Sequence, residues 1–204
     1  MKYEKFRAKV KNLPIIDIRY LKLAGEYNHA FKIQLQRWQK KGKVIKLKRG
    51  LYVLNSEDRK DNLSRLFISK ELYGPSYVSL EYALSFYGLI PEKVVDITCV
   101  TTKKTMSFEN AMGKFIYQHI KEKYFTGFSE QRDDSNFAYF IATPEKAVVD
   151  FLYLNQNRFS GDYKRVLLES FRFQNTDILD KTKMVNYTEL FFSSKLEKII
   201  KLLV

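Results

Sequence analysis

Residues 28–54, NHAFKIQLQRWQKKGKVIKLKRGLYVL, decide the fold, because a helical pattern passes here into a pattern of two strands. In the first part, Phe31, Leu35 and Trp38 follow one another at intervals of four and three residues. That spacing places them on one apolar stripe of a helix. Asn28 is a typical residue to cap such a helix, and a glycine is placed to end it. The sequence therefore predicts an amphipathic helix here.

The second part of this stretch predicts a β-hairpin. Two runs rich in β-branched and apolar residues, 44–47 and 51–54, are separated by a turn that contains Gly50. The hairpin tip and its approach are basic. Four cations are expected there: Lys43, Lys46, Lys48 and Arg49.

Two shorter helices are expected before this stretch. Residues 2–11 place Phe6 and Val10 four positions apart, on what would be an inward face. After a proline, Asp17 can cap a second helix over residues 18–24. Three helices followed by a hairpin are the layout of a winged helix-turn-helix, whose third helix enters the DNA major groove while the hairpin tracks the flanking backbone.

The helix face opposite the apolar stripe is basic and amide-bearing, and it carries no acid. Long, flexible donors of this kind reach base edges and phosphates of double-stranded DNA. The expected DNA-binding residues are His29, Lys32, Gln36, Arg37, Lys40, Lys43, Lys46, Lys48 and Arg49. Other interpretations exist: a charged helix can be only a solvated face, a basic hairpin edge can guard against aggregation, and some winged helices bind proteins.

The charge distribution divides the chain. Residues 1–55 hold 15 Lys or Arg and 3 Asp or Glu, so this part of the 204-residue chain carries +12 of the total +13. A charge confined to one segment is typical of a site for a polyanion. The break predicts a winged helix-turn-helix domain over residues 1–55, a linker over 56–62 and a second domain over 63–204.

The second domain is expected to be α+β, with a small, mostly antiparallel sheet and C-terminal helices. Thr143-Pro144-Glu145 is a strong helix start, with a cap, a proline at the first position and an acid near the positive end of the helix dipole. Helices are expected over 63–73, 80–87, 144–154, 161–171, 176–184 and 187–203, and strands over 94–100, 105–108, 114–120, 124–128 and 137–141.

Residues suited to catalysis or metal binding are sparse, so no enzyme, metal or cofactor is expected. The single Cys99 lies in an apolar run and is expected in the core. His29 and His119 are far apart in sequence, which disfavours a zinc site and favours His29 as a DNA contact. Asp96 stands in the apolar run and could pair with a lysine such as Lys146, and a buried structural pair explains such a residue more often than an active site does. Because no signal peptide or membrane-spanning stretch is found, a cytoplasmic protein with no membrane partner is expected.

Four segments in series resemble AbiEi-type antitoxins of bacterial type IV toxin–antitoxin systems. They are KGKVIKLKRGLYVL (41–54), VSLEYALSFYGLIPE (78–92), ITCVTTKK (97–104) and ATPEKAVVD (142–150). The resemblance covers about residues 30–155, and the helices after Gly161 carry no matching motif. It implies an N-terminal winged helix that represses its own operon through inverted repeats. It also implies a C-terminal domain that counters a nucleotidyltransferase toxin without a stable complex.

The leading hypothesis from the sequence is therefore a DNA-binding transcriptional repressor that is also an antitoxin. One alternative is a stand-alone winged-helix transcription factor whose aromatic-rich second domain senses a ligand. A less favoured alternative is a nuclease acting on DNA, which would need clustered acids for a metal. The identity of the neighbouring gene would separate the first two, and metal-dependent DNA cleavage would favour the third.

Overall fold

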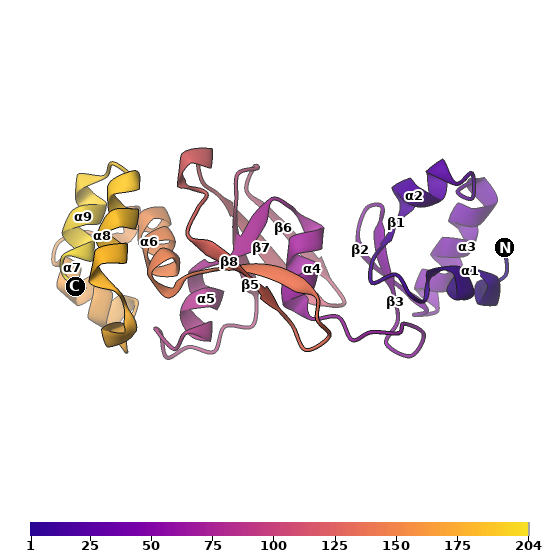
Figure 1. Cartoon of the computed structure of the whole chain (residues 1–204), viewed down its shortest axis with the longest axis horizontal. Helices are drawn as coiled ribbons and strands as arrows, with labels where there is room; N and C mark the ends of the chain where they lie inside the picture. The colour runs from indigo at the N-terminus through magenta and orange to yellow at the C-terminus, as the bar shows by residue number, and fades with distance from the viewer. Residues whose placement is uncertain (204) are drawn as a thin grey trace.

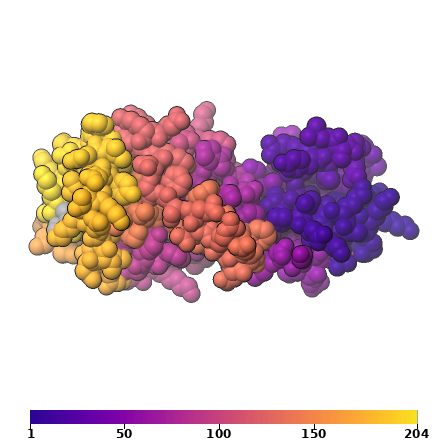
Figure 2. Space-filling view, in the orientation of Figure 1, coloured from indigo at the N-terminus to yellow at the C-terminus, as the bar shows by residue number. Residues whose placement is uncertain are grey.

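The computed structural model describes residues 1–203. The molecule is elongated, with the N-terminal helices at one end and the C-terminal helices at the other (Figure 1). A space-filling view shows the indigo N-terminal residues gathered in one lobe, which meets the rest of the chain across a narrower waist (Figure 2). Within residues 1–203, no helix combines the length and the apolar character needed to cross a bilayer.

Three helices form most of the N-terminal lobe: α1 (Tyr3–Val10), α2 (Ile18–Leu23) and α3 (His29–Lys40). The expected caps are confirmed. The Asp17 carboxylate accepts a hydrogen bond from the backbone N–H of Arg19 at 2.8 Å, and the Asn28 side chain accepts one from that of Phe31 at 2.9 Å. Each cap satisfies a backbone donor that lacks a partner at the start of a helix.

The core of this lobe is largely aromatic. Phe6 stacks on Trp38 with 4.8 Å between ring centroids, and Phe31 meets both rings edge-on. Val10 and Leu35 are buried beside them. The apolar stripe expected on α3 is therefore confirmed, and so is the inward face expected on α1.

A three-stranded antiparallel sheet completes the lobe, in the order β1 (Ile16–Asp17), β3 (Leu51–Leu54), β2 (Val44–Lys48). The hairpin β2–β3 is confirmed. Strand β1 was not expected, because two residues are too few for an alternating pattern to show in sequence. The pairing register shifts between Lys46 and Lys48, so β2 contains an irregularity of the β-bulge type.

Residues 55–62 form turns and lead to the second half of the chain, which is built on a six-stranded sheet in the order β6-β7-β5-β4-β9-β8. The strands are β4 (Ser76–Val78), β5 (Ile97–Thr101), β6 (Met106–Asn110), β7 (Gly113–His119), β8 (Phe128–Arg132) and β9 (Ala138–Ala142). Two of its five pairings, β4 with β9 and β5 with β7, are parallel.

The fold is thus mixed α and β, as expected. The sheet of the second half has six strands and is larger than expected, and it is mixed, with three of its five pairings antiparallel. The central strand β4 lies between two helices in the chain and has only three residues. It is too short for a strand pattern, so the sequence indicated only the end of one helix and the start of the next. Its parallel pairing of Val78 with Ile141 joins segments that are distant in the chain. Such long-range pairings leave no local pattern.

The bounds of several other elements differ from those expected from the sequence. Residues 122–124 form a 3₁₀ turn in place of the start of an expected strand, and the exposed edge strand β8 follows it. The helices α4 (Arg65–Leu72), α5 (Leu80–Phe86) and α6 (Pro144–Leu154) match their predictions closely. The C-terminal region contains α7 (Tyr163–Arg165), a π-helical turn (Val166–Ser170), a 3₁₀ turn (Thr176–Ile178), α8 (Lys181–Leu190) and α9 (Ser194–Ile200).

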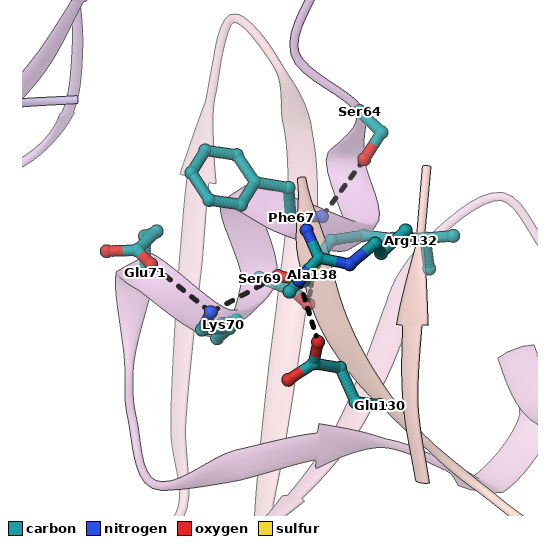
Figure 3. A network of polar contacts seen from close by, with 9 residues as sticks. Ser64, Phe67, Ser69, Lys70, Glu71, Glu130, Arg132 and Ala138 are labelled. Atoms are coloured by element: carbon teal, nitrogen blue, oxygen red, sulfur yellow. Dashed lines mark hydrogen bonds and ion pairs between the residues drawn. The ribbon is translucent and has the colours of Figure 1, made fainter. Parts of the chain in front are cut away.

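Helix α4 lies against the sheet on the side that faces the N-terminal lobe (Figure 1). At its start, the Ser64 hydroxyl accepts a hydrogen bond from the backbone N–H of Phe67 at 3.1 Å. In its last turn, the Lys70 ammonium donates to the carbonyl of Ala138 in β9 at 3.2 Å (Figure 3). Helix α4 is therefore held at both ends.

Candidate nucleic-acid interface

The outward face of α3 is open to solvent. His29, Lys32, Gln36, Arg37 and Lys40 are all exposed there, while the buried stripe of the helix packs on α1 and the three-stranded sheet. The side chains expected to contact DNA are thus accessible along this helix. Ile33, on the same face, is 37% exposed.

A groove of about 470 Å³ runs between α3, α2 and the hairpin. Lys32 and Gln36 of α3 line one wall, and Lys46 and Arg49 of the hairpin line another. Four of the nine expected DNA-binding residues therefore share one hollow, although the chain separates them by up to 17 positions. Cations on several walls of a groove focus positive potential into it.

The acidic residues of the N-terminal lobe do not cancel this charge. Glu4 pairs with Arg7 at 3.8 Å, Glu26 pairs with Lys9, and Asp17 pairs with Arg19 at 2.5 Å. Arg19 lies nearby and donates two side-chain hydrogen bonds that lower the pKa of Asp17. The Asp17 carboxylate therefore stays ionised, and its charge is paired with Arg19 and not with a cation of the groove.

By contrast, the groove and helix cations have no acidic partner. Within residues 1–203, no ion pair forms to any member of the set Lys32, Arg37, Lys40, Lys46 and Arg49. Their charge is available to a ligand. An anion with regularly spaced charges would neutralise them without first breaking internal pairs.

Two expected contacts lie elsewhere. The Lys43 ammonium lies 4.2 Å from the centroid of the Tyr3 ring, on the α1 side of the hairpin. Lys48 faces the second half of the chain, where its ammonium donates to the carbonyl of Leu72. Burial lowers the pKa of Lys48, and the charge of the nearby Lys103 lowers it further. Neither side chain lines the groove.

The groove also contains residues that the sequence analysis did not select. Lys22 of α2 lines it, with its ammonium 5.4 Å from the centroid of the Tyr27 ring, and Gln39 lines it from the end of α3. Lys22 belongs to the short helix that follows the Asp17 cap, so a helical projection of α2 toward α3 would have been the signal to find it. Arg19, 85% exposed at its side chain, lies at the start of the same helix.

Cys99, Asp96 and Lys146 all lie outside the groove. Cys99 is fully buried, and this burial raises the pKa of its thiol to about 12, which confirms it as a core residue. Within residues 1–203, no group of three or more His, Cys, Asp or Glu side chains could hold a metal ion. The expected pairing of Asp96 with Lys146 was wrong. Asp96 lies 3.7 Å from Lys114 at the surface, because it precedes β5 and is not inside it.

Lys146 instead pairs with Asp150, one turn along α6, and both side chains are fully buried. The Tyr77 hydroxyl and the Ser79 hydroxyl donate to the same carboxylate at 2.8 and 3.0 Å. Burial raises the pKa of Tyr77 well above its ordinary value, so the phenol keeps the proton that it donates. This cluster joins α6 to β4 and is fully hydrogen-bonded, which is typical of a structural role.

No protein-family model matches the chain, and a search of curated proteins finds no similar sequence.

Proposed function

We propose that this chain is a DNA-binding transcriptional repressor that also acts as an antitoxin. The observation that carries the DNA-binding part is the groove in which Lys32 and Gln36 of α3 converge with Lys46 and Arg49 of the hairpin. The unpaired cations supply charge for phosphates, and the amide of Gln36 supplies the donor and acceptor pair that reads adenine. The fold that we assign to this lobe is a winged helix-turn-helix.

The order of elements supports that assignment. Helix α1, strand β1, helices α2 and α3, and the hairpin β2–β3 follow one another in the chain, with β1 paired to β3. In this arrangement α3 enters the major groove of duplex DNA, and the hairpin contacts the neighbouring phosphates. His29, Lys32, Gln36, Arg37 and Lys40 lie along α3, while Lys46 and Arg49 act from the hairpin. Lys43 and Lys48 are left out of the contact set, because both are engaged within the protein.

The antitoxin part of the proposal rests on the resemblance of the four segments between residues 41 and 150 to AbiEi-type antitoxins. We assign this activity to residues 63–204 and DNA binding to residues 1–55, in a cytoplasmic protein. The functional partner would be a nucleotidyltransferase toxin, countered without a stable complex. Rescue of growth on co-expression with a nucleotidyltransferase toxin of such a system tests this part, and continued growth arrest would refute it.

DNA binding is tested by fluorescence anisotropy with duplex DNA from upstream of the gene. The Lys46→Ala/Arg49→Ala variant should bind every sequence more weakly, and the slope of log affinity against log salt should fall by about 0.9 for each phosphate that the protein no longer neutralises. The matched control is Lys183→Ala/Lys198→Ala, which removes the same charge from exposed positions on α8 and α9. If both variants weaken DNA binding equally, the loss reflects the net charge of the protein alone, and the groove is not the binding site.

A further inference from the structure

The hairpin β2–β3 belongs to two hydrophobic cores at once. Val44, Tyr52 and Leu54 are buried in the core of the N-terminal lobe. Leu47, Leu51 and Val53 are buried in the large core of the second half, at 3%, 6% and 1% exposure. Alternate residues of a strand point to opposite faces, so the hairpin forms a wall that both halves share.

The irregularity in β2 divides the lysines of this wall. In a regular strand, residues two apart face the same side, so Lys46 and Lys48 would point together. The register shift between them breaks that rule. Lys46 lines the groove beside α3, while Lys48 reaches the carbonyl of Leu72 at the end of α4.

A second polar contact holds the same strand. The Asn110 side-chain amide, at the end of β6, donates to the carbonyl of Leu47 at 3.1 Å. Its oxygen accepts a hydrogen bond from the backbone N–H of Met112 at 2.8 Å, which fixes the turn into β7. The hairpin therefore rests on an element of the large sheet that is itself held in place.

The surface under the hairpin tip is equally fixed. Helix α4 ends at Leu72, and its position is set by the Ser64 cap and by the bond from Lys70 to Ala138 (Figure 3). The Lys103 ammonium donates to the carbonyl of Gly74 just beyond the helix. Two lysines thus satisfy carbonyls at the C-terminal end of α4, where the helix dipole favours positive charge.

We propose that Asn110 is a positioning residue for DNA binding: from the second half of the chain, it fixes the hairpin so that Lys46 and Arg49 face the groove beside α3. This inference rests on the proposed function. Cations on a strand that can shift relative to α3 would lose conformational freedom when they bind DNA, and this loss weakens affinity. Anchored by Asn110, they have lost that freedom before DNA arrives.

The test is a double-mutant cycle in the full chain, read by anisotropy with upstream duplex DNA. Asn110→Ala should weaken binding about three- to tenfold, as expected when the free energy of one hydrogen bond is expressed in affinity. In the Lys46→Ala/Arg49→Ala background the same substitution should have no further effect, because the positioned cations are absent. Equal weakening in both backgrounds would mean general destabilisation and would overturn the proposal, as would no weakening in either.

Tyr87→Phe is the matched control, since it removes one side-chain bond to a backbone carbonyl, that of Ala142, elsewhere in the second half. It should leave DNA affinity unchanged. Should Asn110→Ala fold poorly, Lys48→Met is the second variant, because it removes the hydrogen bond from Lys48 to the Leu72 carbonyl. Its effect on DNA affinity should likewise disappear in the Lys46→Ala/Arg49→Ala background.

Hydrogen exchange of the free protein separates this inference from the proposed function. Asn110→Ala should speed exchange of the backbone amides in residues 44–54, and Tyr87→Phe should not. If the unaltered chain binds no duplex DNA, the proposed function fails, and exchange still decides whether Asn110 anchors the hairpin. Unchanged exchange in Asn110→Ala would overturn the anchoring itself.

Discussion

At the scale of single residues, Gln36 is an uncharged side chain of the groove, to which the proposed function assigns the reading of a base. Replacing Gln36 with Ala should reduce discrimination at one base-pair position by about 1–3 kcal/mol and should leave the salt dependence of affinity unchanged. Competition binding with operator variants measures this. Lys32→Ala is the companion variant, which should weaken all sequences alike and reduce the salt slope. A uniform loss for Gln36→Ala would exclude base reading by this residue.

The buried cluster around Asp150 makes a prediction about stability. Asp150→Ala should cost about 3–5 kcal/mol of unfolding free energy, because it leaves the Lys146 ammonium buried without a counter-charge. Tyr77→Phe removes only one donor to that carboxylate and should cost about 1 kcal/mol. Urea unfolding of both variants measures the difference. If the two substitutions lower the unfolding free energy by similar amounts, the buried pair of Lys146 and Asp150 does not contribute as we expect.

The buried thiol of Cys99 should make the unfolding free energy depend on pH in the alkaline range. Burial raises the pKa of its thiol from 9.0 to about 12, so the folded protein keeps the proton that the unfolded chain loses above pH 9. This contribution to stability is complete below pH 9 and is lost as the pH rises toward 12. The unfolding free energy should therefore fall more steeply between these limits than in Cys99→Ala, which lacks the titrating group. Parallel pH profiles for the two proteins would contradict it.

At the scale of elements, the Asn28 cap controls the start of α3. Asn28→Ala should cost about 1 kcal/mol of stability and loosen the first turn, which carries His29 and Lys32. DNA affinity should fall with it. Ser193→Ala removes the equivalent cap of α9, where the Ser193 hydroxyl accepts from the backbone N–H of Leu196 at 3.2 Å. That control should lose stability but keep DNA affinity, and a loss of affinity in both would contradict a local effect.

The same element shows what the sequence could predict. Helix α3, its cap and its exposed basic face follow from spacing alone, because local geometry determines them. The hairpin was also predictable, yet the side to which each cation points was not. Lys46 and Lys48 diverge because of a register shift, and the target of Lys48 is a carbonyl 24 positions away. Strand β4 was missed because it has only three residues, and its parallel pairing with β9 joins segments that are remote in the chain.

At the scale of the whole molecule, the shared hairpin predicts that the two halves unfold together. Leu47, Leu51 and Val53 would lose their burial if the second half unfolded alone, at a cost of about 1.5–3 kcal/mol for each large apolar side chain. Trp38, the only tryptophan, reports on the N-terminal core, and alkylation of the buried Cys99 reports on the other. Urea titrations read by the two signals should therefore coincide, and Val53→Ala should shift both midpoints equally. A Cys99 transition at clearly lower urea than the Trp38 transition would instead mean that the N-terminal lobe stays folded without the second half, and DNA binding by a fragment of residues 1–55 should then survive removal of the second half.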